Sequence, residues 1–244
     1  MAGDLQTGVT LQTLDTKHFD RGLILDQTSP FDIPYPCDIT RLLSLASERG
    51  AQLLADGIRS RLFVPPLMEA PICKHIHASR HAPKIQTEDR HPDWLTWSGE
   101  KIRRYQGAVG PLWNTASTST QFSQRKRVIL TSIETVDLPL VFHERLPDDR
   151  PLPQVEPGLP FTNKSLDSVL NRRPYLQLPD TKYAEEWHDL PLYVFASDGT
   201  LMRINALKVE GEKEAAARRA ALKAKLLPGP VAGKLHCKFY GRLQ

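Results

Sequence analysis

Residues 192–207, LYVFASDGTLMRINAL, carry the strongest short hairpin signal in the chain. Two largely apolar runs, Leu192 to Ala196 and Thr200 to Leu207, flank the turn residues Ser197-Asp198-Gly199. An Asp-Gly pair between apolar runs favours a tight turn between antiparallel strands, because glycine adopts a positive φ without steric cost. We therefore predict a two-stranded β-ribbon near 192–207.

A further strand is predicted on the N-terminal side of this ribbon. Residues 127–136 are rich in β-branched residues, which fit the pleated surface of a sheet. Leu138 to Phe142 is expected to continue the strand after a break at Pro139, which cannot donate to a ladder.

Prolines dominate the segment between this strand and the ribbon, with nine of them from Pro139 to Pro191. Such a segment excludes a long helix or a central strand, because each proline lacks a backbone N–H. We expect extended surface segments with one or two helical turns near Ser165 to Asn171. Residues 127–208 therefore form one proline-rich region with short strands and the ribbon.

The C-terminal part is expected to be a helix and a tail. Six alanines favour a helix over residues 209–227, with glutamates toward its start and arginines and lysines toward its end, as the helix dipole prefers. Pro228-Gly229-Pro230 ends the helix, and residues 228–244 form a basic, aromatic tail.

The N-terminal part is expected to be an arm followed by two helices. The apolar residues of 1–37 do not recur at a regular spacing, and the segment closes with three prolines, which indicates an extended arm. Asp38 suits a helix N-cap, apolar residues then recur at helical spacing, and Gly50 suits the helix end. A second helix through Leu62 completes a helical hairpin over residues 38–64.

Residues 65–126 form an irregular region that contains aromatic residues and histidines. A short helix is expected around Asp93 to Tyr105, and Thr115 to Thr120 is expected to be a polar link. Together these elements predict a mixed α+β fold with extensive irregular, proline-rich extended segments, an N-terminal helical hairpin, a β-ribbon and a C-terminal helix.

Composition excludes several classes of protein. The apolar runs of this 244-residue chain are far shorter than the roughly 20 residues that cross a bilayer, so no membrane insertion is expected. Three cysteines are too few and too scattered for a disulfide framework, which favours a reducing compartment. With 32 basic and 28 acidic residues, the net charge of +4 suits an acidic partner, either a filament such as tubulin or RNA.

Motifs that carry chemistry are sparse. The sequence has no Gly-x-Ser-x-Gly elbow and no glycine spacing typical of a phosphate-binding loop. Cys73, His75, His77 and His81 form a cluster that resembles a metal site, but its spacing fits no zinc module. We predict no catalytic residue, no metal ligand and no cofactor, and leave open whether Cys73, His75 and His77 bind metal.

Several clusters combine basic and aromatic residues, which neutralise phosphates and stack on bases, or dock on a carboxylate-rich protein surface. These clusters supply the candidate partner contacts, which are Arg103, Arg104, Tyr105, Arg125, Lys126, Arg127, Arg218, Arg219, Lys238 and Tyr240.

Extended, proline-rich sequence buries little apolar surface to offset a conformational entropy of about 1–2 kcal/mol per residue. We therefore expect several protein subunits of a large complex to order the chain. The favoured function is a structural subunit without enzymatic activity that clamps its neighbours, in a microtubule or axonemal lattice of the cytoplasm, cytoskeleton or cilium. The alternatives are a ribosomal or accessory subunit of an organelle, with a mitochondrial location, and, less favoured, a metal-dependent enzyme.

Overall fold

The computed structural model describes residues 1–15, 17, 22–71, 82–117, 125–136, 156–161, 190–226 and 239–240. The chain divides into two compact units, Met1–Lys84 (unit 1) and Ile85–Gln244 (unit 2). The class is mixed α+β with several antiparallel sheets, as the sequence predicts.

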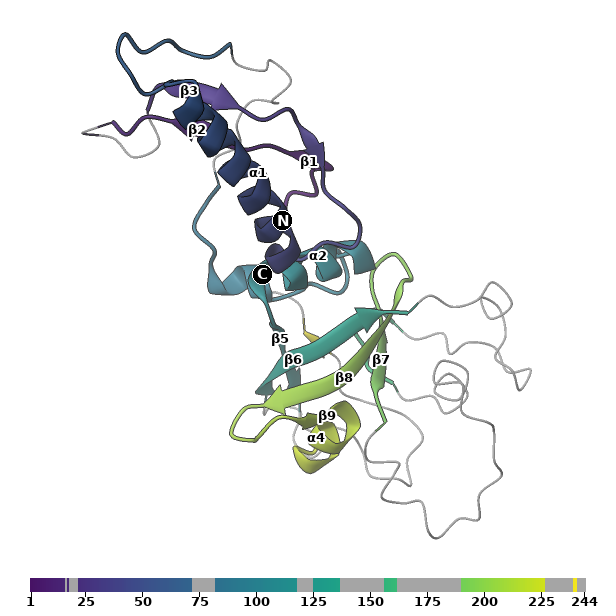
Figure 1. Ribbon diagram of the computed structural model, residues 1–244. Coiled ribbons are helices and arrows are strands. Elements are labelled where there is room, and N and C mark those ends of the chain that lie inside the picture. Colours follow the sequence, from purple (N-terminus) through teal and green to yellow (C-terminus); the bar gives the residue numbers. More distant parts are fainter. Residues whose placement is uncertain are drawn as a thin grey trace. The chain divides into compact units, whose positions relative to one another are not determined.

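Unit 1 consists of two short antiparallel strand pairs and one long helix (Figure 1). One pair joins β1 to β4 and the other joins β2 to β3. The elements are β1 (Gln6–Thr7), β2 (Thr10–Gln12), β3 (Ile24–Gln27), β4 (Phe31–Asp32) and α1 (Ile39–Arg59). Residues 1–37 thus contain paired strands where the sequence predicts an unpaired extended arm.

Helix α1 continues through both of its glycines instead of ending at Gly50, so it replaces the predicted helical hairpin. Asp38 is the N-cap, as predicted, and its carboxylate accepts a hydrogen bond of 2.8 Å from the backbone N–H of Arg41. At Gly57 a Cβ atom would lie only 2.8 Å from Cδ2 of Leu11. This glycine therefore gives β2 room to approach the helix, which the sequence pattern does not reveal.

Unit 2 is built on an antiparallel sheet that curls into a half-barrel, with strand order β10-β5-β6-β8-β7 and β9 added beside β8 (Figure 1). The strands are β5 (Leu112–Ser117), β6 (Arg125–Thr135), β7 (Leu192–Phe195), β8 (Leu201–Val209), β9 (Ala215–Ala216) and β10 (Phe239–Tyr240). The helices are the 3₁₀ helix η1 (Thr87–Arg90), α2 (Gly99–Val109) and α4 (Ala217–Lys223).

The predicted ribbon forms one end of this sheet, with β7 as its last strand. Strands β7 and β8 pair antiparallel across Ser197-Asp198-Gly199, from Leu192 opposite Ile204 to Phe195 opposite Leu201. The ribbon is not isolated, because β8 also pairs along its other edge with β6.

The core of unit 2 lies between the inner face of the sheet and the helices. Ile102 of α2 is fully buried with Leu130, Ile204 and Leu207 of the sheet. Buried Trp94 donates from Nε1 to Oδ1 of Asn114 at 2.9 Å, and Nδ2 of Asn114 donates to the Pro92 carbonyl at 3.1 Å. The buried polar groups of this tryptophan and asparagine are therefore paired.

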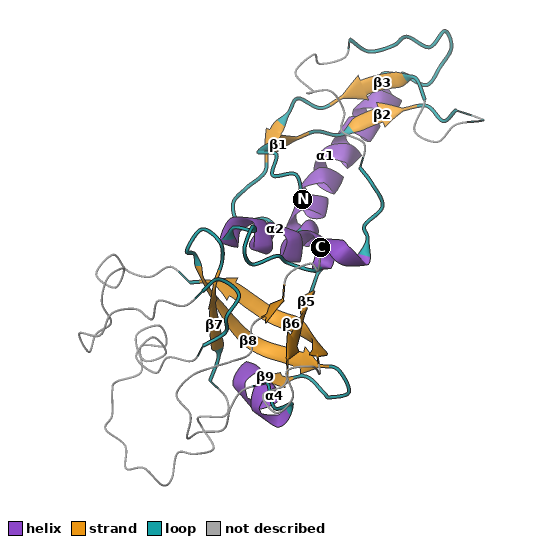
Figure 2. Cartoon of the chain, turned by 180° about the vertical axis from the view of Figure 1, so that it is seen from behind, coloured by secondary structure: helices purple, strands orange, loops and turns teal. Residues whose placement is uncertain are grey.

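The predicted helix over residues 209–227 is much shorter in the structure. Val209 ends β8 with its side chain in the core, and Gly211 turns the chain with a φ of 80°. Helix α4 spans only Ala217–Lys223 and packs against β8 (Figure 2). The alanines of α4 are small enough to let the helix pack closely against the sheet. Helix propensity scales describe the backbone preference of alanine and do not predict this packing.

Other expectations differ in position or lie beyond the described residues. Helix α2 starts later than the predicted Asp93, because Ser98 is its N-cap, and the supposed polar link begins inside β5. The predicted strand over 127–136 matches β6 to within two residues. Two other segments, Leu138–Phe142 and Ser165–Asn171, fall outside the described residues.

Candidate nucleic-acid interface

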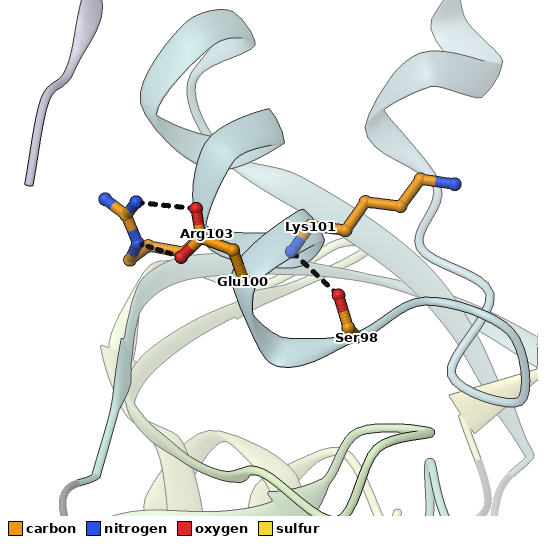
Figure 3. Close-up of polar contacts among 4 residues, drawn as sticks. All are labelled: Ser98, Glu100, Lys101 and Arg103. Atoms are coloured by element: carbon orange, nitrogen blue, oxygen red, sulfur yellow. Dashed lines mark hydrogen bonds and ion pairs between the residues drawn. The ribbon is translucent and has the colours of Figure 1, made fainter. Parts of the chain in front are cut away.

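The N-terminal half of α2 holds two cations in different environments (Figure 3). Ser98 caps the helix by accepting a hydrogen bond of 3.2 Å from the backbone N–H of Lys101. Arg103 forms a bidentate pair with Glu100, with N···O distances of 3.0 and 2.9 Å, and its side chain is only 19% exposed. The charge of Arg103 is therefore largely neutralised within the fold.

Lys101 points away from this pair (Figure 3) and contacts aromatic rings instead. Its Nζ atom lies 4.5 Å from the ring centroid of Trp97 and 5.8 Å from that of Tyr105. The two rings are 4.4 Å apart and pack against the core. The cluster thus packs Tyr105, a predicted partner contact, against the core of unit 2.

A second group of basic and aromatic residues lies on the outer face of the sheet. Trp113 of β5 and Arg127 of β6 occupy diagonal positions on this face, because Trp113 is opposite Ile129 and Thr115 is opposite Arg127. The guanidinium carbon of Arg127 lies 4.3 Å from the Trp113 ring centroid. The guanidinium cation therefore lies over an indole ring in a cation–π contact.

The indole of Trp113 is held in place from two further directions. Its Nε1 donates to the Thr87 carbonyl at 3.2 Å, and the ring of His91 meets it edge-on at 4.4 Å. His91 is buried, so it supports the tryptophan from within unit 2. Trp113 therefore presents a fixed surface to Arg127.

Further cations extend this face along the neighbouring strands. Arg125 lies two residues before Arg127 and, by strand alternation, shares its face, while Lys208 of β8 is directly opposite Ile129. Both side chains are exposed. We call Trp113, Arg125, Arg127 and Lys208 the basic face.

Lys126 lies between these arginines and faces the other side of the sheet. The hydrogen bond from Lys223 is the main cause that lowers the pKa of Glu212, and the charge of Lys126 lowers it further. Lys126 therefore belongs to a local charge cluster and not to the basic face.

The remaining predicted contacts are dispersed. Arg104 is half-buried on α2, and among the described residues its buried Nε has no hydrogen-bond partner. On α4, Arg218 is half-buried and Arg219 is exposed. Tyr240 belongs to β10, whose backbone alone is described, and Lys238 lies outside the described residues.

Sequence reasoning missed Trp113 and Lys208 as members of this face. Lys208 lies between the end of the predicted ribbon and the start of the predicted helix, although its polar side chain between Leu207 and Val209 fits strand alternation. Trp113 gives no such local signal, because only the register of β5 against β6 brings it to Arg127.

The described residues contain no group of three or more histidines, cysteines or acidic residues that could hold a metal. The Cys73, His75, His77 and His81 cluster lies outside them. Within the same ranges, no helix is long and apolar enough to cross a membrane.

Comparison with known proteins gives a similarity over part of the chain. No family model matches the chain. Over 132 residues it is 30% identical to a curated protein of Saccharomyces cerevisiae, "Methionyl-tRNA formyltransferase, mitochondrial". The match covers 46% of this chain and 32% of the yeast protein, so the chain spans about a third of the length of that relative.

This similarity corrects the functional expectations. The relative is an enzyme that acts on a tRNA, which contradicts both a structural subunit without enzymatic activity and a microtubule or axonemal lattice. It also leaves the cytoplasmic or cytoskeletal location unsupported and agrees better with the organellar alternative.

Proposed function

We propose that this chain is part of a mitochondrial enzyme that acts on methionyl-tRNA, and that unit 2 contributes tRNA binding through the basic face. Two independent observations support the proposal. The first is the similarity to the yeast formyltransferase. The second is the arrangement of Arg125, Arg127 and Lys208 around Trp113 on one exposed sheet face.

The observation that carries the proposal is the environment of Arg127. Its guanidinium contacts Trp113, and among the described residues no carboxylate forms an ion pair with it. By contrast, the guanidinium of Arg103 forms an ion pair with the carboxylate of Glu100. An exposed cation without a paired carboxylate is free to neutralise a phosphate and release its counterions.

The reaction named for the yeast relative indicates why unit 2 would bind tRNA. A formyl transfer to methionyl-tRNA needs the aminoacyl end held against the transfer site, and contacts to the RNA backbone supply position without contributing to the reaction itself. We assign unit 2 this positioning role and assign no described residue to the transfer step.

Binding of methionyl-tRNA by the full chain, measured by fluorescence anisotropy across a salt series, tests the proposal. The triple variant Arg125→Ala, Arg127→Ala, Lys208→Ala should bind more weakly, and each lost phosphate contact should lower the salt slope by about 0.7–0.9. A control with the same charge change, Lys17→Ala, Arg59→Ala, Lys213→Ala, should bind like the wild type. Equal affinities of the two triple variants would refute the proposal.

A further inference from the structure

We infer that the Arg127–Trp113 stack binds an unpaired nucleotide of the RNA, with its base lying on the outer side of the Arg127 guanidinium. This inference rests on the proposed function and deepens it, because it states which part of an RNA the basic face recognises.

The stack is built so that its flat surface is fixed. Trp113 is held by the hydrogen bond to Thr87 and by the edge of His91, and Arg127 lies 4.3 Å from its ring centroid. The backbone of Arg127 is held as well, because its N–H donates to the Glu210 carboxylate at 3.2 Å and its carbonyl accepts from the Glu210 N–H at 2.9 Å. A fixed platform loses little conformational entropy when a ligand binds.

The exposed side of the guanidinium is suited to a second flat ring. The indole lies against the guanidinium from one direction, with the guanidinium carbon 4.3 Å from the ring centroid, and the Arg127 residue is exposed. Guanidinium planes stack on nucleobases, and stacking accepts any base because every base has a π-face. The platform therefore favours a base without selecting its identity.

The geometry distinguishes an unpaired nucleotide from a duplex. In an A-form duplex the base faces are covered by their neighbours, so a protein contacts phosphates and 2′-hydroxyls instead. A stacking platform needs a base that is turned out of the helix or lies in a single-stranded end. Arg125 on the same strand and Lys208 on the next strand lie near enough to contact the phosphates that flank such a base.

The variant Arg127→Lys separates stacking from charge, because lysine keeps the positive charge but lacks the planar fork. The full chain is titrated with two RNAs of equal phosphate number, a hairpin with an unpaired 3′ tail and a blunt duplex. Arg127→Lys should weaken binding to the tailed hairpin about 5- to 100-fold, and binding to the duplex less than twofold. The control Arg59→Lys makes the same exchange at an exposed position of α1 outside the basic face, so it should change neither affinity by more than about twofold.

Tryptophan fluorescence gives a second readout that does not depend on affinity. The tailed hairpin should quench the emission of the wild type more strongly than the duplex does, and Trp113→Phe should remove the difference. If Arg127→Lys weakens both RNAs equally or neither, the inference fails.

The outcomes separate this inference from the proposed function. Wild-type protein that binds the duplex and the tailed hairpin equally, with a steep salt dependence, would overturn the stacking inference and leave the tRNA-binding role in place. Wild-type protein that binds no RNA would overturn both.

Discussion

Gly99 joins two parts of unit 2 at the scale of a single residue. It is the first residue of α2, and its backbone N–H donates to the Asp198 carboxylate in the β7–β8 turn at 3.2 Å. A Cβ atom at this position would lie 2.4 Å from Cγ2 of Thr200 and 2.6 Å from its Cβ. The turn and the helix therefore meet at a point where only a hydrogen atom fits.

Gly99→Ala should destabilise unit 2 by about 1–3 kcal/mol, because the added methyl group forces α2 and the β7–β8 turn apart. Urea unfolding measures the change. The matched control is Gly50→Ala in α1, where the new Cβ would make only ordinary contact with Val9 at 3.4 Å. That change should be neutral or slightly stabilising. A Gly99→Ala protein as stable as the wild type would contradict the packing at this point.

Asp198 makes the same junction sensitive to pH. Burial acts to raise the pKa of its carboxyl group, but hydrogen bonds from Thr200 and from the Gly99 N–H outweigh burial, so the pKa is lowered from 3.8. A lowered pKa means that the folded state favours the carboxylate. The stabilisation is therefore complete above the unfolded pKa of about 3.9 and is lost as the pH falls through the folded value.

Asp198→Asn should keep the turn, because asparagine suits the same position, and should remove only the charge-dependent part of the stability. We expect a modest loss in the free energy of unfolding at pH 7, since the group is largely exposed. The difference in the free energy of unfolding between the wild type and Asp198→Asn should close below about pH 4, where the Asp198 carboxylate becomes protonated. Chemical denaturation at several pH values tests this, and a gap of unchanged size at pH 3 would contradict it.

At the level of helices and strands, the sequence predicts those features that depend on residues close together in the chain, such as turns and helix caps. The β7–β8 ribbon follows from Asp198-Gly199 and the Asp38 cap of α1 from residue type, and the structure confirms both. The alanine content predicts a C-terminal helix that is longer than the one in the structure. Val209 instead pairs with Val128 of β6, and this pairing keeps the end of β8 in a strand. Tertiary pairing of this kind has no local signature.

The sequence predicts only part of the candidate site. The run of arginine and lysine at residues 125–127 was identified, but its division between the two faces of β6 requires knowing that the segment is a strand. Pairing of Arg127 with Trp113 further requires the register of β5 against β6.

Removal of the N-cap tests the predicted start of α1. Asp38→Ala should destabilise the first turn of the helix by about 0.5–2 kcal/mol, because the Arg41 N–H loses its partner. Hydrogen exchange of the amides at the start of α1 is the suitable measurement. The exposed Asp4 provides a control as Asp4→Ala, which should leave that exchange unchanged. Equal protection in all three proteins would argue against the cap.

At the scale of the whole molecule, apolar groups are divided unevenly. In the part of the chain that the structure describes, all but one of the buried core hydrophobics belong to unit 2, the exception being Phe31. Among the described residues, all but two of the exposed large hydrophobics belong to unit 1, and they include Leu43, Leu54 and Ile58 on α1. Unit 2 thus has a core of its own, whereas unit 1 leaves much of its apolar surface in contact with solvent.

Deletion of Met1–Lys84 should therefore leave a protein that unfolds cooperatively, because the core of unit 2 is retained. It should also reduce the fluorescence of an added hydrophobic dye, since the deletion removes most of the exposed large hydrophobics that the structure describes. Calorimetry and dye titration of the full chain and the deletion variant give both quantities. A deletion variant without a cooperative transition would show that unit 2 depends on unit 1.

The long connection between β6 and β8 has a consequence for biosynthesis. Strand β6 ends at Thr135, its partner β8 begins only at Leu201, and the two pair from Val128 with Val209 to Thr135 with Met202. A ribosome adding about 5–20 residues per second exposes one edge of β6 for roughly 3–13 s before β8 has been made. An open edge invites pairing with other nascent chains, so a chaperone that shields β6 during this interval would raise the yield of folded protein.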